Sequence, residues 1–202
     1  MTKTAYVDVG GTNTRFFVGL RGVWTAAEKK KWKKKLAHLS PHIEVISDVE
    51  LAHRRAFGKK SGIVLNAGTG SIAYGRSSGR AVRAGGVGPL LGDQGSAFWI
   101  GREYLRQAKG DDWKLLRKIA VGKNPVAKIA SFARRGLKDK RVAEQAQNDL
   151  IALVVNVVKK LRAKEVLPVA VQGGLFADRR FRERFWKKLL RSPLKRRVRR
   201  SA

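Results

Sequence analysis

The sequence predicts a mixed α/β protein, and three observations carry that prediction. Short apolar strand patterns alternate with amphipathic helix patterns along the 202 residues. Ten of the 21 glycines fall between Gly62 and Gly95, where they mark turns between strand patterns. Hydrophobic residues make up 43% of the chain, which is enough to build a core. We therefore expect a globular α/β fold.

The first 57 residues carry five strand and helix patterns. Alternating apolar residues predict the strands, and apolar residues three and four positions apart predict the helices. A strand, its hairpin partner, a helix, a short buried strand and a second helix are expected, in that order, over residues 4–9, 15–20, 25–39, 43–46 and 49–57.

The chain from residue 58 onward begins with strands and continues with helices. Three strands, two helices, one more strand and a last helix are expected over residues 62–67, 71–75, 81–84, 97–108, 142–164, 167–171 and 179–190. Asp93 or Ser96 is placed to cap the helix over 97–108. The residues after 190 are expected to form a basic tail.

Composition excludes several classes of protein. The chain has no cysteine, so it cannot form a disulfide framework, a thiolate zinc site or an iron–sulfur cluster. No apolar stretch approaches the roughly 18 residues that a membrane span requires, and the N-terminus does not resemble a secretory signal. A cytoplasmic protein with no membrane association is expected.

The charge is strongly positive and unevenly spread. There are 45 Lys and Arg residues against 15 Asp and Glu, a net charge of +30. Residues 29–35 have the sequence KKKWKKK, and the last 25 residues carry 12 basic and 2 acidic side chains. One interpretation is a solvated helix face and tail. The other is contact with nucleic acid phosphates, in which Trp32 and Trp186 are either core residues, the interpretation that we favour, or stacking partners for bases.

Three glycine turns each follow a strand pattern. Residues 8–14 have the sequence DVGGTNT, residues 67–71 have AGTGS, and Gly173-Gly174 follows the last long strand. Converging backbone N–H groups in such turns bind phosphate oxygens, and the threonine and serine hydroxyls add donors. A carboxylate beside the first turn, Asp8, is suited to Mg²⁺ held through water. Neither a Walker A loop nor a dinucleotide fingerprint fits these glycines.

The order of these turns resembles the actin-like, sugar kinase and Hsp70 ATPase superfamily. Within it, the sequence resembles the BadF/BadG/BcrA/BcrD-type ATPase family, which includes N-acetylglucosamine kinases. The segment GGVGPLLGDQGSAFWIG at residues 85–101 carries most of the likeness, with support from 8–15, 21–25 and 45–51. The resemblance implies a two-lobed actin-like ATPase (ribonuclease H-like) fold, with a shortened first lobe over 1–57 and a second lobe over 58–202.

The resemblance also implies a role for each matching residue. ATP phosphates are expected at both glycine turns, on Gly10, Gly11, Thr12, Thr14, Gly68, Thr69, Gly70 and Ser71. The adenosine is expected at Gly173 and Gly174. The sugar is expected at Gly86, Gly92 and Asp93. Mg²⁺ is expected near Asp8, and Asp48 matches the catalytic base.

Two residues can be interpreted in more than one way. Asp48 follows Ser47 at the start of a helix, so it is either the base or the helix cap. Gly70 is expected to lie where a side chain would occupy the phosphate site, so that Gly70→Val weakens nucleotide binding with little unfolding. Gly68 is expected to serve the turn itself through a positive φ.

The sequence departs from the family pattern in places that bear on activity. The first lobe is short, Val87 stands where tryptophan is usual, and Gln94 stands where glutamate is usual.

The main expectation for the function is ATP-dependent phosphorylation of an amino sugar. The alternatives are a family member that binds nucleotide without transfer, and a polyanion-binding protein. The dehydratase-activating members need cluster cysteines, which are missing here. ATP and a sugar are the expected ligands, and a homodimer is expected to cover an exposed sheet edge.

Overall fold

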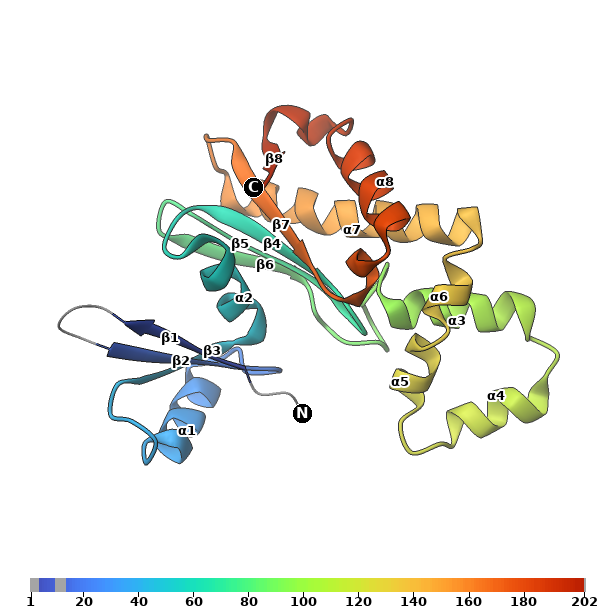
Figure 1. Cartoon of the computed structure of the whole chain (residues 1–202), viewed down its shortest axis with the longest axis horizontal. Helices are drawn as coiled ribbons and strands as arrows, with labels where there is room; N and C mark the ends of the chain where they lie inside the picture. The colour runs from blue at the N-terminus through green and yellow to red at the C-terminus, as the bar shows by residue number, and fades with distance from the viewer. Residues whose placement is uncertain (1–3, 10–13, 202) are drawn as a thin grey trace. The chain divides into compact units, whose positions relative to one another are not determined.

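The computed structural model describes residues 4–9 and 14–201. Contacts divide the chain into two compact units, Met1–Lys60 (unit 1) and Ser61–Ala202 (unit 2). Each unit is an α/β structure built on its own sheet (Figure 1). Over the described ranges, no helix is long and apolar enough to cross a membrane.

Unit 1 is a three-stranded sheet with two helices. Its elements are β1 (Thr4–Val9), β2 (Thr14–Leu20), α1 (Ala26–Leu36), β3 (Ile43–Ser47) and α2 (Asp48–Phe57). The sheet order is β1-β2-β3, with β1 antiparallel and β3 parallel to β2. The expected helix over residues 25–39 is shorter at both ends, because Thr25 is its N-cap and Leu39 is exposed.

Alternation along the strands places apolar side chains on both faces of the unit 1 sheet. Leu20, Ile43 and Val45 form a small buried cluster against which Trp32 and Leu36 of α1 pack. Successive residues of a strand point to opposite faces, so Phe17 and Gly19 face the other way, toward α2. A Cβ on Gly19 would lie 2.6 Å from Leu51 Cδ2, so a glycine is needed for α2 to lie this close.

Unit 2 is a five-stranded sheet covered by helices. Its strands are β4 (Gly62–Ala67), β5 (Ser71–Ser77), β6 (Arg80–Gly85), β7 (Leu167–Gln172) and β8 (Val198–Arg200), in the order β6-β5-β4-β7-β8. Its helices are α3 (Ala97–Ala108), α4 (Trp113–Ala120), α5 (Pro125–Ala130), α6 (Ala133–Gly136), α7 (Lys140–Leu161) and α8 (Arg179–Leu189), with short 3₁₀ turns η1 (Gly174–Ala177) and η2 (Pro193–Arg196).

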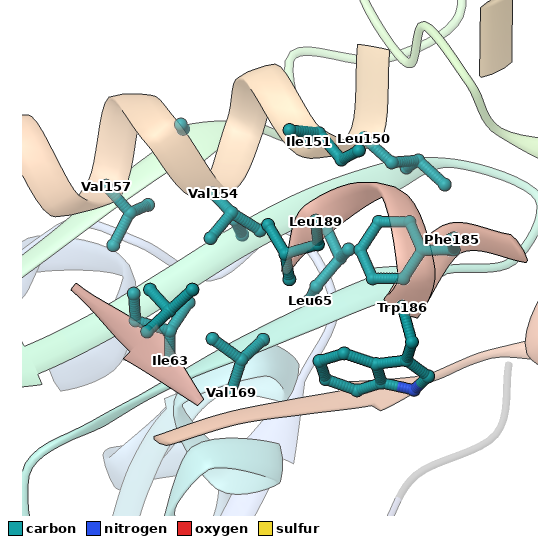
Figure 2. Close-up of a cluster of buried hydrophobic side chains, with 14 of the residues drawn as sticks. Ile63, Leu65, Leu150, Ile151, Val154, Val157, Val169, Phe185, Trp186 and Leu189 are labelled. Atoms are coloured by element: carbon teal, nitrogen blue, oxygen red, sulfur yellow. The ribbon is translucent and has the colours of Figure 1, made fainter. Parts of the chain in front are cut away.

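The core of unit 2 lies between the sheet and helices α7 and α8. Ile63, Leu65 and Val169 of the sheet meet Leu150 and Val154 of α7, with the aromatic rings of α8 beside them (Figure 2). All five are fully buried. At about 1.5–3 kcal/mol for each buried aliphatic side chain, this cluster is the main stabilising feature of the unit.

The C-terminal residues are part of the fold, so the expectation of a basic tail is wrong. Strand β8 pairs in parallel with β7, with Leu167 opposite Val198. Val198 and Leu194 are buried, whereas Arg199 and Arg200 are exposed. Burial of Leu194 and Val198 therefore holds the C-terminal segment against the sheet. Arg199 and Arg200 lie at the solvent-exposed edge of the sheet.

Candidate functional site

The second glycine turn joins β4 to β5 in unit 2 and is anchored on helix α3. The Gly68 N–H donates to the Gly70 carbonyl at 3.0 Å. The carbonyls of Gly68 and Thr69 accept from the Ala97 and Phe98 N–H groups at 2.8 and 3.2 Å, so the turn caps the helix. Within the described ranges, the N–H groups of Thr69 and Gly70 have no acceptor. Two such donors side by side can bind an anion.

Asp93 holds the segment before α3 against this turn. The side chain is buried, its φ is +60°, and its Oδ1 accepts from the Ser71 N–H at 3.2 Å. The Ser71 hydroxyl in turn donates to the Gln94 carbonyl at 2.7 Å. Ser96 caps α3 by accepting from the Trp99 N–H. Of the two expected caps, Ser96 is therefore the one used, and Asp93 is tied to the glycine turn.

The two glycines of the turn have different surroundings from those expected. A Cβ on Gly70 would lie 2.7 Å from Asp93 Oδ2, so a side chain there would displace a buried carboxylate. A Cβ on Gly68 would meet nothing within 4 Å, and the φ of Gly68 is not positive. The expected positive φ of Gly68 is therefore wrong, and the space beside Gly68 is open. The close approach of Asp93 runs against the expectation that Gly70→Val causes little unfolding, whereas its effect on nucleotide binding stays a prediction.

The third glycine turn lies beside the second. Strands β4 and β7 run in parallel with Asn66 opposite Gln172, so the residues that follow them meet at one edge of the sheet. Gly173 has a φ of +101°, and a Cβ there would overlap the Ala67 carbonyl. Gly174 has open space around it. The structure therefore brings Gly173 and Gly174 next to the Gly68 turn.

The expected sugar residues surround the same strand end. The Gly86 N–H donates to the Ser71 carbonyl at 2.9 Å, while Asp93 accepts from the Ser71 N–H. Gly92 closes a short loop through its N–H to the Gly88 carbonyl at 2.8 Å. Gly86 and Asp93 are therefore both hydrogen-bonded to the backbone of Ser71. Gly92 directly precedes Asp93 in the chain, so all three expected sugar residues lie near Ser71.

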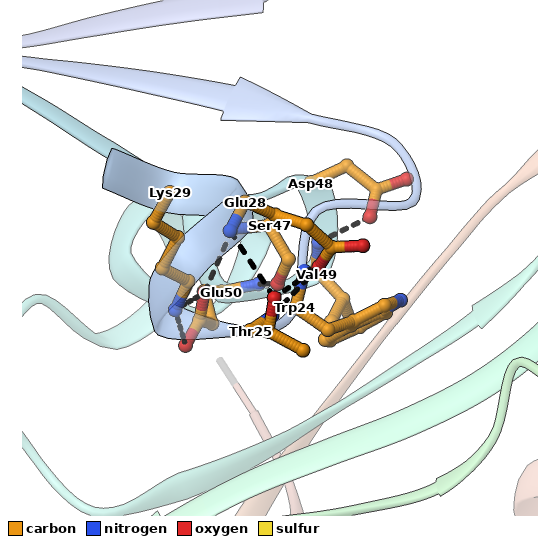
Figure 3. Close-up of polar contacts among 8 residues, drawn as sticks. All are labelled: Trp24, Thr25, Glu28, Lys29, Ser47, Asp48, Val49 and Glu50. Carbon is orange, nitrogen blue, oxygen red and sulfur yellow. Dashed lines mark hydrogen bonds and ion pairs between the residues drawn. The ribbon is translucent and has the colours of Figure 1, made fainter. Parts of the chain in front are cut away.

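In unit 1, Asp48 is the first residue of α2, directly after β3. It is not the helix cap, because Ser47 accepts from the Glu50 N–H and Glu50 Oε2 accepts from the Ser47 N–H at 2.7 Å. Asp48 Oδ1 accepts from the Val49 N–H at 2.9 Å. The Asp48 carboxylate points away from the capping contacts (Figure 3). Of the two interpretations of Asp48, the capping role belongs to Ser47.

Burial changes the acidity of Asp48. Partial burial raises the pKa of its carboxyl, and the Val49 N–H and the charge of Arg21 oppose that rise. Arg21 is nearby because β2 and β3 are parallel with Leu20 opposite Ser47, so the next residue of each strand lies at the same edge. A carboxylate with a raised pKa is a stronger proton acceptor than an ordinary aspartate.

A network of capping contacts that the sequence analysis missed fixes the position of Asp48. Thr25 and Glu28 form a second capping box at the start of α1. Lys29 Nζ lies 2.8 Å from Glu50 Oε2 and joins the two helix starts (Figure 3). The signal was available in the sequence, since Thr25 and Ser47 are each followed three residues later by glutamate.

The first glycine turn lies largely outside the described residues. Gly10, Gly11 and Thr12 are not described, and for Asp8 and Thr14 only the strand backbone is, opposite Arg15 and Val9. Over the described ranges, no three His, Asp or Glu side chains gather as a metal site. Mg²⁺ bound with a nucleotide takes one or two carboxylates and completes its shell with phosphate and water, so the residue types present fit such an ion.

Comparison with solved structures shows the fold of the chain. A putative N-acetylglucosamine kinase from Porphyromonas gingivalis matches with a TM-score of 0.59 and 24% identity, over 88% of this chain and 70% of that one. A putative N-acetylglucosamine kinase from Chromobacterium violaceum matches with a TM-score of 0.61 and 20% identity, over 92% and 71%. The predicted actin-like sugar kinase fold is confirmed, in a chain shorter than these structures.

Sequence comparison defines the family. A profile of the BadF/BadG/BcrA/BcrD ATPase family matches residues 12–200, and the chain belongs to this family. The N-acetylmuramic acid/N-acetylglucosamine kinase of Clostridium acetobutylicum is 29% identical over 167 residues. That match covers 66% of this chain and 54% of the kinase, so the chain spans about half of the length of this relative.

Proposed function

We propose that the protein is an ATP-dependent phosphotransferase whose acceptor is a hydroxyl group of an N-acetylated amino sugar. One observation carries the proposal: two glycine turns and a buried aspartate meet at one edge of the unit 2 sheet, with two unbonded N–H groups in the second turn. Family membership over residues 12–200 and the names of the relatives support ATP and a sugar as the ligands.

The proposal assigns the phosphates to the two glycine turns. These are Gly68, Thr69, Gly70 and Ser71 in unit 2, and Gly10, Gly11, Thr12 and Thr14 in unit 1. The unbonded N–H groups of Thr69 and Gly70 are suited to phosphate oxygens. The adenosine is assigned to Gly173 and Gly174, which follow the neighbouring strand β7.

Asp48 is proposed as the acceptor of the proton from the sugar hydroxyl. Phosphoryl transfer requires the nucleophile to be oriented and deprotonated while charge on the phosphate is neutralised. The capping box of Ser47 and Glu50 fixes the Asp48 backbone, and partial burial raises the pKa of its carboxyl. Mg²⁺, assigned to Asp8 through water, would neutralise phosphate charge. Asp93, Gly86 and Gly92 are assigned to the sugar.

The test is direct assay of the purified chain. We expect Mg-ATP to raise its melting temperature and one amino sugar to raise it further, because each ligand binds the folded state. ADP release and a phosphorylated sugar, detected by mass spectrometry, should depend on both ligands. Stabilisation by Mg-ATP without transfer to any sugar would favour a family member that binds nucleotide without transfer. No response to Mg-ATP would overturn the proposal.

Two further assignments belong to the same proposal. We propose that the protein acts in the cytoplasm, where ATP is supplied. We also propose a homodimer, because each sheet ends in edge strands with which a second copy could pair. Light scattering that shows a monomer at micromolar concentration would remove the dimer and leave the phosphotransferase proposal intact.

A further inference from the structure

A basic groove lies between helices α6, α7 and α8 of unit 2, and no role is yet assigned to it. Its volume is about 890 Å³, within the range of small-molecule binding sites. Leu137, Ala143 and Phe181 supply apolar walls. Six basic side chains line it: Arg134, Lys138, Lys140, Arg180, Arg184 and Lys188.

The acidic side chains of the groove are already engaged. Glu144 forms an ion pair with Lys188 at 3.0 Å. Asp178 caps α8, where its Oδ1 accepts from the Phe181 N–H at 2.8 Å. Over the described part of the chain, the other five basic residues of the groove lie within ion-pair distance of no carboxylate. The six basic side chains therefore outnumber the two carboxylates of the groove, Glu144 and Asp178, and only Lys188 of the six is paired with either of them.

The excess of basic side chains in a concave groove favours binding of a small and highly charged anion. Like charges around apolar walls repel one another more strongly than on an open surface, and a bound anion relieves that repulsion. The planar guanidinium groups of Arg134, Arg180 and Arg184 can each donate two hydrogen bonds to one phosphate. A phosphate monoester carries about −1.5 to −2 charges at neutral pH, so the excess of four basic over acidic side chains in the groove matches about two phosphate groups.

We propose that the α6–α7–α8 groove binds a small molecule that bears at least two phosphate groups. The residues that line it are separate from the glycine turns, so the site is additional to that of the transferred phosphate. A concave pocket of this size fits a small ligand better than a nucleic acid duplex. The ligand is a polyphosphate, either inorganic or attached to a nucleoside.

The test compares two double variants of α8 with the same loss of charge. R180A/R184A removes two groove residues, whereas R179A/K187A removes two exposed cations of the same helix that do not line the groove. All four side chains are exposed, so both variants should fold, and thermal melting checks this. Inorganic tripolyphosphate is the probe, and calorimetry measures its affinity.

We expect tripolyphosphate to bind the parent chain and R179A/K187A with affinities within about threefold of each other. R180A/R184A should bind it at least about tenfold more weakly, since each charge-assisted hydrogen bond contributes about a factor of ten or more. Equal weakening in both variants would mean a general effect of net charge and would overturn the proposal. Binding that is lost in Gly68→Val but kept in R180A/R184A would place the probe at the glycine turn and also overturn it.

Two further measurements identify the source of the phosphate. If ADP affinity also depends on Arg180 and Arg184, the ligand is a nucleoside polyphosphate, and if it does not, the ligand is an inorganic polyphosphate. Either result upholds a phosphate site. Binding of duplex DNA that depends on these arginines, without binding of tripolyphosphate, would replace the small ligand with a nucleic acid and refute the proposal.

Discussion

The two units hold their helices on their sheets in different ways. In unit 2, α7 buries Leu150, Val154 and Val157 fully against a five-stranded sheet. In unit 1, α1 buries no residue and packs on the sheet through the partly buried Trp32 and Leu36. A small core contributes less free energy, so the capping boxes and the Lys29–Glu50 pair are a larger share of what orders unit 1.

The units also differ in the chemistry that they offer. Unit 1 presents a side chain, Asp48, at the start of a capped helix. Unit 2 presents backbone N–H groups in a turn fixed by α3 and Asp93. If the proposed function is correct, changes in unit 1 should affect the transfer step, and changes in the unit 2 turn should affect nucleotide binding. The following predictions test that division, from the largest expected effect to the smallest.

The largest effect is expected for Asp48→Asn. The substitution keeps the size of the side chain and removes the proton acceptor, so phosphate transfer to the sugar should fall by about 10²–10⁴-fold. Affinity for Mg-ATP should stay unchanged, because the binding turn of unit 2 is intact. Transfer rates and nucleotide titrations on the same samples measure the two quantities.

Ser47→Ala is the matched control for Asp48. It removes the side chain that caps α2 and should cost about 0.5–2 kcal/mol of stability. Its transfer rate at saturating ligands should fall far less than that of Asp48→Asn. Equal transfer by Asp48→Asn and the parent chain would reject Asp48 as the base.

The second prediction compares two glycines of the unit 2 turn. Gly68→Val should weaken Mg-ATP binding about tenfold or more with little change in melting temperature, because its side chain enters open space beside the unbonded N–H groups. Gly70→Val should lower the melting temperature, because its Cβ would lie 2.7 Å from Asp93 Oδ2. Unchanged nucleotide affinity in Gly68→Val would remove this turn from the site.

A third prediction concerns the edge strand of unit 2. Val198→Ala should cost about 1–3 kcal/mol, because the valine is buried against the sheet. Arg199→Ala, one residue further along the strand and exposed, should change stability by less than about 0.5 kcal/mol. Chemical denaturation of both variants measures the difference. Similar losses in the two variants would contradict the assignment of Val198 to the core.

The smallest effect is the pH dependence of stability at Asp48. Burial raises the pKa of this carboxyl in the folded chain, so the folded state binds the proton more tightly than the unfolded state. The stability contribution of Asp48 therefore falls as pH rises from about 3.9 through the raised value. Asp48→Asn should be slightly more stable than the parent at pH 7 and similar to it at pH 3. A variant that is less stable at pH 7 would contradict this sign.

Local patterns predicted most of the elements. Strands β1 and β4 and helix α3 have the bounds that their residue patterns predict. Apolar residues at every second position mark the buried face of a strand, and apolar residues three and four positions apart mark the buried face of a helix. The glycine turn of residues 68–70 and the sugar kinase fold class also followed from the sequence. The roles of Asp48 and of the glycines in the proposed reaction are still predictions.

Other features were decided by contacts between distant residues. Asp93 is a local candidate for a helix cap, yet it bonds to Ser71, 22 residues earlier. The arginine-rich end looked like a solvated tail because its few apolar residues are separated by basic ones. The burial of Val198 depends on pairing with the distant strand β7.

The sequence by itself determined where most of the longer strands and helices lie, because those depend on neighbours within a few residues. Which turn carbonyls cap α3, which glycine has open space and which basic side chains share one groove were decided only by the tertiary structure. Each of these depends on which segments far apart in the sequence lie next to each other in the folded chain. Local residue patterns do not show which distant segments come into contact.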